Sequence, residues 1–398
     1  MPTTQTRTRT TRTPASDAAL LRAIEPVGAE EFLGRYWERA PLHVARSEPG
    51  RFDDLLSADE AVRAMEEPGL RYPGFRLVQA DAKHDPRAYT TDLPWRPTAF
   101  TGTAEPAHVV PAFAAGATLV LQGLHLHRAA TAAYCRRLEA FLGHPAQLNA
   151  YFTPRRSQGL PVHHDTHDVF VLQVAGSKRW LVYEPVWELP LKHQRYEAAM
   201  GEPGETVLDV VLDAGDTLYL PRGWMHEALT SDEDSLHLTV GVNVATWTDA
   251  LRAAAARCET DVAFRRGLPP DGDGGGEVLE RLGRELDPEA VAAARRRAFV
   301  QSRRPILSGQ LAQLRRLDAI GPQTTVERRD TVIAELADDV LLFEGKELRF
   351  PAHALDEVAA LVEADGPVRL AHLPGRLDDP GRVVLARRLV REGFLVAR

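Results

Sequence analysis

A twelve-residue stretch of the chain, Gly159–Phe170 (GLPVHHDTHDVF), holds three histidines and two aspartates. Along an extended strand, alternate side chains point to the same side of the backbone. His163 and Asp165 are therefore predicted to face one way, and His164 the other. An imidazole and a carboxylate held side by side could bind a metal ion, but the same spacing also occurs in polar strands and loops that bind none.

A third candidate ligand lies downstream, in the segment GDTLYLPRGWMHEAL. A strand is expected there, then a corner at Pro221 and Gly223, and then a second strand that begins near His226. Such a corner could return His226 to His163 and Asp165. Two histidines and one carboxylate form the facial set that leaves positions open on Fe(II) for a bidentate cosubstrate and O2.

The other histidines of the region are weaker candidates. His164 is expected to pack or to face solvent, and His167 lies two residues beyond Asp165 on the face of His163. Three more histidines have no carboxylate beside them on their expected strands: His125, His127 and His237.

Lys178 is one of only four lysines in a chain that otherwise uses arginine for positive charge. It follows an expected hairpin turn at Gly176–Ser177, within VFVLQVAGSKRWLVY. A compact ammonium on the neighbouring strand could bind the far carboxylate of a dicarboxylate whose other end is held by the metal. The alternative is an exposed turn lysine beside Arg179.

The chain is expected to divide into four parts. Residues 1–17 are predicted to be a disordered basic tail. Residues 18–245 alternate short apolar runs with turn residues, which favours an antiparallel two-sheet or closed β architecture. Residues 246–317 are Ala- and Arg-rich with helical spacing, interrupted by LPPDGDGGG, and their narrow apolar stripe predicts a homodimer. Residues 318–398 combine a hairpin with helices, as in a winged helix.

Composition limits the classes of partner. The net charge of −8 does not favour nucleic acid as the main partner. Residues 321–398 hold 14 acidic and 11 basic side chains, so direct DNA binding by the winged-helix-like part is not expected. Two distant cysteines and the lack of a long apolar segment predict a cytoplasmic protein without a membrane span.

Several motifs together resemble the JmjC oxygenases of the cupin superfamily, and specifically the ribosomal oxygenase branch. They are RYWERAPLHV, LNAYFTP, SQGLPVHHD, DVFVLQVAGSKRWLVYEP and GDTLYLPRGWMHEA. The resemblance covers the chain beyond the tail. It implies a mixed, mainly β catalytic domain with a JmjC/cupin double-stranded β-helix, a helical dimerisation region and a C-terminal winged-helix-like module.

The resemblance also implies the roles of individual residues. Fe(II) would be bound by His163, Asp165 and His226, and the distal carboxylate of 2-oxoglutarate by Lys178. Asn149 and Tyr151 would lie on a strand that lines the pocket, and Thr239 would place a hydroxyl beside Lys178.

The implied activity is 2-oxoglutarate-dependent hydroxylation of a side chain, histidine or arginine, in a ribosomal protein. His164 and Thr166 replace an aromatic and an acidic residue of the family pattern near the pocket rim, which leaves the substrate open. The alternatives are the same iron chemistry on a biosynthetic peptide or a small molecule, and a non-catalytic cupin or winged-helix binding protein.

Overall fold

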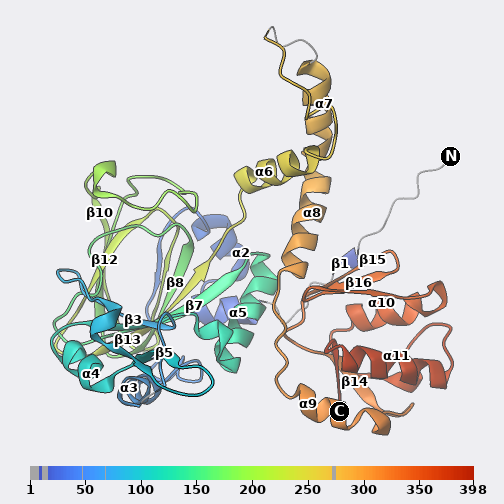
Figure 1. Ribbon diagram of the computed structural model, residues 1–398, viewed down its shortest axis with the longest axis horizontal. Helices are drawn as coiled ribbons and strands as arrows, with labels where there is room; N and C mark the ends of the chain where they lie inside the picture. Colours follow the sequence, from blue (N-terminus) through green and yellow to red (C-terminus); the bar gives the residue numbers. More distant parts are fainter. Residues whose placement is uncertain (1–8, 11–16, 47, 68, 271–274) are drawn as a thin grey trace. The chain divides into compact units, whose positions relative to one another are not determined.

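The computed structural model describes residues 9–10, 17–46, 48–67, 69–270 and 275–398 (Figure 1). The chain forms two compact units. One comprises Ser16–Phe141 and Pro145–Asn243, and the other comprises Met1–Ala15, Leu142–His144 and Val244–Arg398.

Two antiparallel β-sheets form the centre of the first unit. The larger has seven strands in the order β2-β11-β8-β13-β7-β6-β3, and the smaller has three in the order β10-β9-β12. The strands of the larger sheet are β2 (Leu42–Val44), β3 (Phe75–Val78), β6 (Thr118–Leu121), β7 (Ala146–Thr153), β8 (Asp168–Ala175), β11 (Thr217–Leu220) and β13 (Ser235–Val242). Those of the smaller sheet are β9 (Lys178–Tyr183), β10 (Thr206–Leu212) and β12 (Met225–Thr230).

Apolar side chains from the two sheets pack against one another. Val169 and Val171 of β8 lie in one buried cluster with Trp180 and Val182 of β9. Strands β8 and β13 are buried along almost their whole length, as expected for central strands with neighbours on both edges. The β-rich architecture predicted for this part of the chain is present.

The turn at Gly176–Ser177 differs from the prediction. Strand β8 pairs with β11 and β13, whereas β9 pairs with β10 and β12, so the turn joins the two sheets and is not a hairpin. Both edges of β8 are already occupied, which leaves no place for β9 beside it. Gly176 has φ +61°, and a Cβ there would lie 1.9 Å from the carbonyl oxygen of Asp234. Only glycine fits this crossing.

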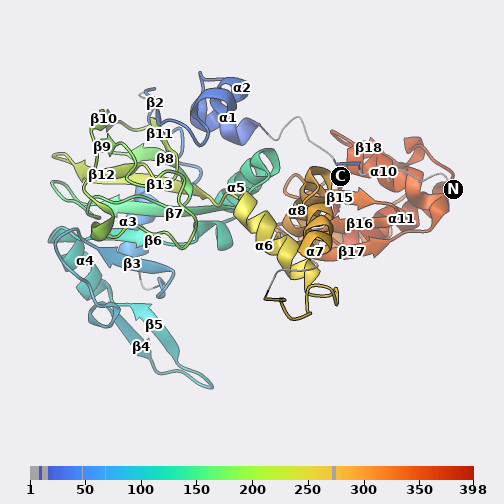
Figure 2. The same ribbon diagram turned by 90° about the horizontal axis from the view of Figure 1, so that it is seen from above.

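Helices and a small hairpin surround the sheets. The helical segments are α1 (Ala18–Ile24), α2 (Ala29–Glu31), η2 (Phe32–Tyr36), α3 (Ala58–Glu66), η3 (Pro86–Ala88), α4 (Pro106–Ala114), η4 (Leu124–Leu126), α5 (Ala129–Leu142) and η5 (Ala198–Met200). Strands β4 (Thr90–Leu93) and β5 (Phe100–Ala104) form a two-stranded sheet that extends from this unit (Figure 2).

The prediction of a strand around His125 and His127 is wrong. This segment forms the short 3-10 helix η4, which begins after Gly123 in a left-handed conformation of φ +64°. The Nδ1 atom of His125 faces the backbone N–H of Leu148, at 3.1 Å, and so helps to fix β7. The two side chains therefore do not share a strand face.

The second unit begins with the helices α6 (Trp247–Cys258), α7 (Gly275–Glu285), α8 (Pro288–Gln301) and α9 (Gln310–Arg315). The side chains of Thr246 and Asp249 form a capping box that starts α6. Of the interruption expected at LPPDGDGGG, residues 271–274 lie outside the described residues, and α7 already begins at Gly275.

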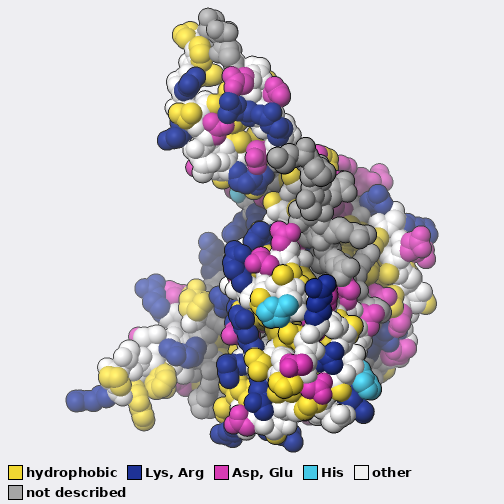
Figure 3. Space-filling view, turned by 90° about the vertical axis from the view of Figure 1, so that its right-hand side faces the viewer, with side chains coloured by type: hydrophobic (Ala, Val, Ile, Leu, Met, Phe, Trp, Pro, Cys, Tyr) yellow, Lys and Arg dark blue, Asp and Glu magenta, His cyan; other side chains and the backbone are white. Residues whose placement is uncertain are grey.

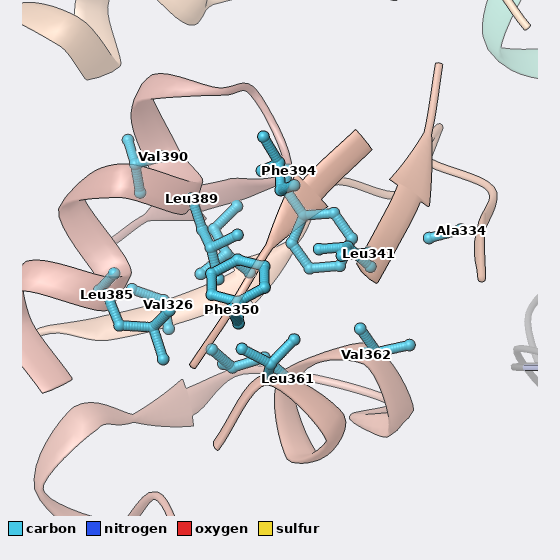
Figure 4. Close-up of a cluster of buried hydrophobic side chains, with 14 of the residues drawn as sticks. Val326, Ala334, Leu341, Phe350, Leu361, Val362, Leu385, Leu389, Val390 and Phe394 are labelled. Atoms are coloured by element: carbon cyan, nitrogen blue, oxygen red, sulfur yellow. The ribbon is translucent and has the colours of Figure 1, made fainter. Parts of the chain in front are cut away.

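The C-terminal part of this unit packs two sheets against two helices. Its sheets have the orders β1-β15-β16-β17 and β18-β14-β19. Their elements are β1 (Arg9–Thr10), β14 (Thr325–Arg328), β15 (Ala334–Ala337), β16 (Val340–Phe343), β17 (Lys346–Arg349), β18 (Val368–Arg369) and β19 (Leu395–Ala397), with the helices η6 (Leu317–Ala319), η7 (Ala352–Ala354), α10 (Leu355–Glu363), η8 (Leu370–His372) and α11 (Asp379–Arg391). Leu361, Leu389 and Phe394 meet in its core (Figure 4).

Three sequence predictions concern this unit. The hairpin expected within residues 318–398 is β16–β17, and the helices expected beside it are α10 and α11. Within the expected tail, Arg9–Thr10 pair with β15, and residues 1–8 and 11–16 lie outside the described residues.

Basic and acidic side chains are interspersed over the face shown in Figure 3. Among the described helices, none has the length and apolar character needed to cross a membrane.

Candidate metal centre and adjoining cavity

The structure brings together the three residues that the sequence singled out as possible metal ligands. His163, Asp165 and His226 each offer one ligand atom, and these atoms all lie within 4.8 Å of one another. Within the described part of the chain, this is the one group of three or more such side chains with that spacing.

Backbone pairing sets the distance between the two histidines. His226 is the second residue of β12, and it forms an isolated antiparallel bridge with His163. Each backbone N–H donates to the other residue's carbonyl oxygen, at 2.8 and 3.1 Å. The imidazole centroids lie 4.5 Å apart. The prediction of a strand through His163 and Asp165 is wrong, because β8 begins only at Asp168. The bridge to His226 nevertheless holds His163 as a strand neighbour would.

Hydrogen bonds also fix which ring nitrogen of each histidine is free. The Nδ1 atom of His163 lies 2.8 Å from the carbonyl oxygen of Pro161, and that of His226 lies 3.0 Å from the carbonyl oxygen of Trp224. A carbonyl oxygen can only accept, so Nδ1 carries the proton in both bonds. In the neutral imidazole, Nε2 then keeps its lone pair, as metal binding requires.

The charge states suit a cation. Burial and then the neighbouring His163 lower the pKa of His226 to about 4, so its imidazole is neutral at pH 7. Burial opposes ionisation of Asp165, but the imidazoles of His167 and His163 outweigh it, and the pKa of this carboxyl falls below its usual value. The group therefore offers a neutral imidazole at His226 and a negative oxygen at Asp165.

His164 and His167 take other positions. His164 is buried, its Nε2 lies 3.1 Å from the carbonyl oxygen of Gln194, and its ring packs edge-on against Tyr196. This agrees with the packing role expected for it. The Nδ1 of His167 lies 4.0 Å from Asp165, too far for a hydrogen bond.

A cavity adjoins the three side chains, and Lys178 lies in its wall. The lysine is buried, with 4% of its surface exposed, and its Nζ donates to the hydroxyl of Thr153 at 3.0 Å. Among the described residues, no carboxylate lies within 4.0 Å of this ammonium group. Burial lowers the pKa of Lys178 to about 7. The alternative of an exposed turn lysine is therefore wrong.

Two of the three other predicted pocket residues line the same cavity. Tyr151 and Thr239 are in its wall. The hydroxyl bonded to Lys178 nevertheless belongs to Thr153 and not to Thr239. Asn149 is not in the wall, and its side-chain oxygen accepts from the backbone N–H of Gly123 at 2.9 Å.

Sequence reasoning missed several polar groups of the cavity. Trp180 and His237 are both nine-tenths buried, and Trp180 Nε1 and His237 Nδ1 have no hydrogen-bond partner among the described residues. The ring of His237 stacks on Tyr151 with centroids 5.1 Å apart. Strand alternation from Tyr151 could have indicated Thr153, two residues later on the same face of β7. No comparable signal marks Trp180, because an apolar strand explains a tryptophan equally well.

Comparison with known proteins agrees with this geometry. Residues 125–250 match the family model described as the JmjC domain, and this range contains all three candidate ligands and Lys178. This part of the chain is a JmjC domain.

Curated relatives of the chain include proteins named ribosomal oxygenase 1 and proteins named NO66. It is 31% identical over 370 residues to ribosomal oxygenase 1 of Gallus gallus, which covers 88% of this chain and 57% of the relative. It is 29% identical over 269 residues to the bifunctional lysine-specific demethylase and histidyl-hydroxylase NO66 of Drosophila persimilis, covering 63% and 36%. The chain thus spans only about a third to a little over half of these relatives' length.

Solved structures show the same fold. A structure of the Escherichia coli ribosomal oxygenase YcfD in complex with cobalt and 2-oxoglutarate aligns with a TM-score of 0.58 and 20% identity, covering 94% of this chain and 98% of that one. The resemblance to the ribosomal oxygenase branch and the JmjC/cupin fold predicted from the sequence are confirmed.

Proposed function

We propose that this JmjC-domain protein is an Fe(II)- and 2-oxoglutarate-dependent dioxygenase that hydroxylates a side chain of a protein. One observation carries the proposal: two histidines and one carboxylate converge on a cavity whose wall holds a buried ammonium group without a carboxylate partner among the described residues.

The donor set fits iron. Two imidazoles and one carboxylate leave three coordination positions open, as in the facial triad of non-haem Fe(II) oxygenases. Both imidazoles donate their Nδ1–H to backbone carbonyls, which is the usual support for a histidine that binds metal through Nε2. We assign His163, Asp165 and His226 as the ligands.

The cavity wall fits a dicarboxylate. A buried ammonium is costly unless an anion pairs with it, so a ligand carboxylate at Lys178 would remove that cost. The indole N–H of Trp180 and the imidazole of His237 offer further hydrogen bonds within the same cavity. 2-Oxoglutarate has a carboxylate for Lys178 at one end and a chelating keto acid for the metal at the other.

The protein's own residues bind and orient the reactants. With iron bound, 2-oxoglutarate and O2 supply the oxidation: the cosubstrate becomes succinate and CO2, and one oxygen atom of O2 enters a C–H bond of the substrate. Lys178 and Thr153 hold the far end of the cosubstrate, and Thr239 and Tyr151 shape the wall. Val169, Val171 and Trp180 limit the access of water.

We infer that the substrate is a ribosomal protein and that a histidine or an arginine is hydroxylated. The names of the relatives support this, because one is a ribosomal oxygenase and another is a bifunctional lysine-specific demethylase and histidyl-hydroxylase. A cytoplasmic location fits such a substrate. A biosynthetic peptide, a small molecule and a purely binding role are the competing possibilities.

The test is succinate formation. The purified protein is incubated with Fe(II), 2-oxoglutarate and ribosomal proteins from cells that lack it, and a 16 Da gain is sought by mass spectrometry. Succinate and a hydroxylated peptide that depend on His163 support the proposal. Succinate with a small peptide but not with ribosomal proteins would favour the biosynthetic alternative, and no turnover with any substrate would favour a binding protein.

We further propose a homodimer built on the helical region. Exposed apolar side chains occur on and between α6 and α7: Trp247 (68%), Leu251 (49%), Val262 (57%), Leu268 (90%) and Leu279 (68%). An apolar surface of this kind is typical of a protein contact. The division into a helical dimerisation region and a winged-helix-like module without direct DNA binding also remains a proposal.

A further inference from the structure

The segment that carries His163 and Asp165 has little regular structure of its own. It runs between the bridge at His163 and the start of β8 at Asp168, so no sheet ladder holds Asp165. One backbone bond does so, from the N–H of Gly223 to the carbonyl oxygen of Asp165, at 3.0 Å. Gly223 belongs to the corner that leads into β12 and His226.

A buried ion pair joins the same two segments beside this bond. Asp168 is fully buried, Arg222 is 7% exposed, and a guanidinium nitrogen of Arg222 lies 3.2 Å from Asp168 Oδ2. Asp168 lies three residues after Asp165, and Arg222 lies four residues before His226. The pair therefore connects the segment with two candidate ligands to the segment with the third.

Two more residues close this pair into a ring. The hydroxyl of Tyr219 donates to Asp168 Oδ1 at 2.9 Å and accepts from the backbone N–H of Glu38, also at 2.9 Å. The carboxylate of Glu38 accepts from Arg222. Each of the four residues contacts two others of the ring, and Arg222 Nε is the one ring nitrogen that is buried without a hydrogen-bond partner among the described residues. Linked buried polar groups of this kind favour one arrangement.

Aromatic rings cover the network on the side of Tyr219, whereas Glu38 and Arg222 line a separate cavity on another side. Trp37 stacks on Tyr219 at 5.9 Å, and the edge contact of Phe32 with Tyr219 is 4.9 Å. Burial raises the pKa of Asp168 to about 6, against the opposing effect of Arg222, so the carboxyl remains ionised at pH 7. The weak screening in such surroundings strengthens the pairing.

We propose that Asp168 and Arg222 are positioning residues of the metal centre, which fix the spacing between the segment of His163 and Asp165 and the segment of His226. This inference rests on the proposed function, because it assumes that these three side chains bind the metal. Neither positioning residue is among the residues that line the cavity. Their effect reaches the metal through the backbone of the two segments.

Asp168→Asn is the informative variant. The amide keeps the shape of the carboxylate and an oxygen that can accept from Tyr219, while Arg222 keeps Glu38 as its counter-ion. The variant is therefore expected to fold. Arg222→Met is the harsher change, because it leaves two carboxylates without their shared cation.

Asp216, beside the larger sheet, offers a matched control for Asp168. Asp216 is also buried, at 2% exposure, and it accepts from the backbone N–H groups of Arg46 and Asp213 at 2.6 and 3.0 Å. It precedes β11, whereas Asp168 begins β8, and the antiparallel register places these two positions at opposite ends of the strand pair. Asp216→Asn removes a comparable buried charge away from the metal centre.

The experiment titrates Co(II) into the full-length parent, Asp168→Asn, Arg222→Met and Asp216→Asn proteins, and records the affinity and the visible spectrum. Asp168→Asn is expected to bind Co(II) about 10- to 100-fold more weakly, with an altered spectrum, because residues that orient metal ligands have effects of this size. Asp216→Asn should stay within threefold of the parent. Urea unfolding of each variant separates loss of metal binding from loss of the fold.

The outcomes separate this inference from the proposed function. If the parent binds no Co(II), both fail. If the parent binds and Asp168→Asn binds equally well, the positioning role alone is wrong. Equal weakening in Asp168→Asn and Asp216→Asn would also overturn it, since a general structural role is then sufficient. A double variant, Asp168→Asn with Arg222→Met, should weaken binding by less than the product of the two single effects, because the pair acts as a unit.

Discussion

At the scale of single residues, side-chain chemistry and spacing indicated three possible metal ligands that the structure brings within 4.8 Å of one another. His163, Asp165 and His226 could be found because a dense run of ligand types precedes a Pro/Gly corner and another histidine. The predicted strand is absent at this position, and a bridge and a loop place His163 and Asp165 instead. For Asn149, strand alternation gives the face of β7 but not the hydrogen bond that its side-chain oxygen accepts from Gly123.

The first prediction distinguishes the ligands from the neighbouring histidines. His163→Ala and His226→Ala should each abolish iron-dependent turnover and lower Co(II) affinity strongly, because each removes one of three donors. His164→Ala and His167→Ala should retain the metal. Metal titration checks this directly. Loss of metal in His164→Ala with retention in His163→Ala would contradict the ligand assignment.

The second prediction concerns the anion-binding role of Lys178. Lys178→Ala should weaken 2-oxoglutarate binding to the Mn(II) form by about 30-fold to several thousand-fold, since losing one partner of a desolvated charge pair costs about 2–5 kcal/mol. Metal affinity should change little. Lys192→Ala, at an exposed lysine, is the control. An affinity within threefold of the parent in Lys178→Ala would remove Lys178 from the site.

A third prediction follows from the lowered pKa of Lys178, about 7 in the ligand-free protein. Only the protonated amine pairs with a carboxylate, and the neutral form becomes dominant as the pH rises above this value. The dissociation constant for 2-oxoglutarate should therefore increase above pH 7, by up to about tenfold per pH unit. Titrations between pH 6 and 9 would show this slope, and Lys178→Met should not show it. A flat profile in the parent would contradict the assignment.

At the scale of secondary-structure elements, apolar runs and turn residues indicated the positions of the main strands. They could not indicate which strands pair, because pairing depends on edges already occupied by distant parts of the chain. The stretch from β8 to β9 is the clearest example: its two apolar runs and its glycine are those of a hairpin, yet both edges of β8 are taken by β11 and β13. The crossing brings Lys178 into the wall of the cavity.

The fourth prediction tests that crossing. Gly176→Ala should destabilise the protein by at least about 2 kcal/mol, because φ is +61° and the new Cβ would overlap the carbonyl oxygen of Asp234. Gly34→Ala is the control, since no atom lies within 4 Å of its added Cβ and its φ is not positive. Urea unfolding gives both values. Equal stability of the two variants would show that the turn can relax.

At the scale of the whole molecule, the spacing of apolar and turn residues along the sequence separated a β-rich part from a helical and mixed part. The contacts give two compact units and assign the helices from α6 onward to the same unit as the C-terminal sheets. Whether those helices form a dimer contact could not follow from one chain. An exposed apolar side chain has the same sequence signature whether a partner or solvent covers it.

The last prediction is the homodimer. Leu279 on α7 is 68% exposed, and Leu251 on α6 is 49% exposed, so a charge at either position would be buried in the proposed contact without a partner. Leu279→Glu should convert a particle of about twice the mass of one chain into a monomer in light scattering at micromolar concentration. Val384→Glu on α11 is matched in exposure, at 67%, and lies outside the helical region, so it should leave the dimer intact. A parent protein that is already monomeric would contradict the proposal. Dissociation by both variants would move the contact away from the helical region alone.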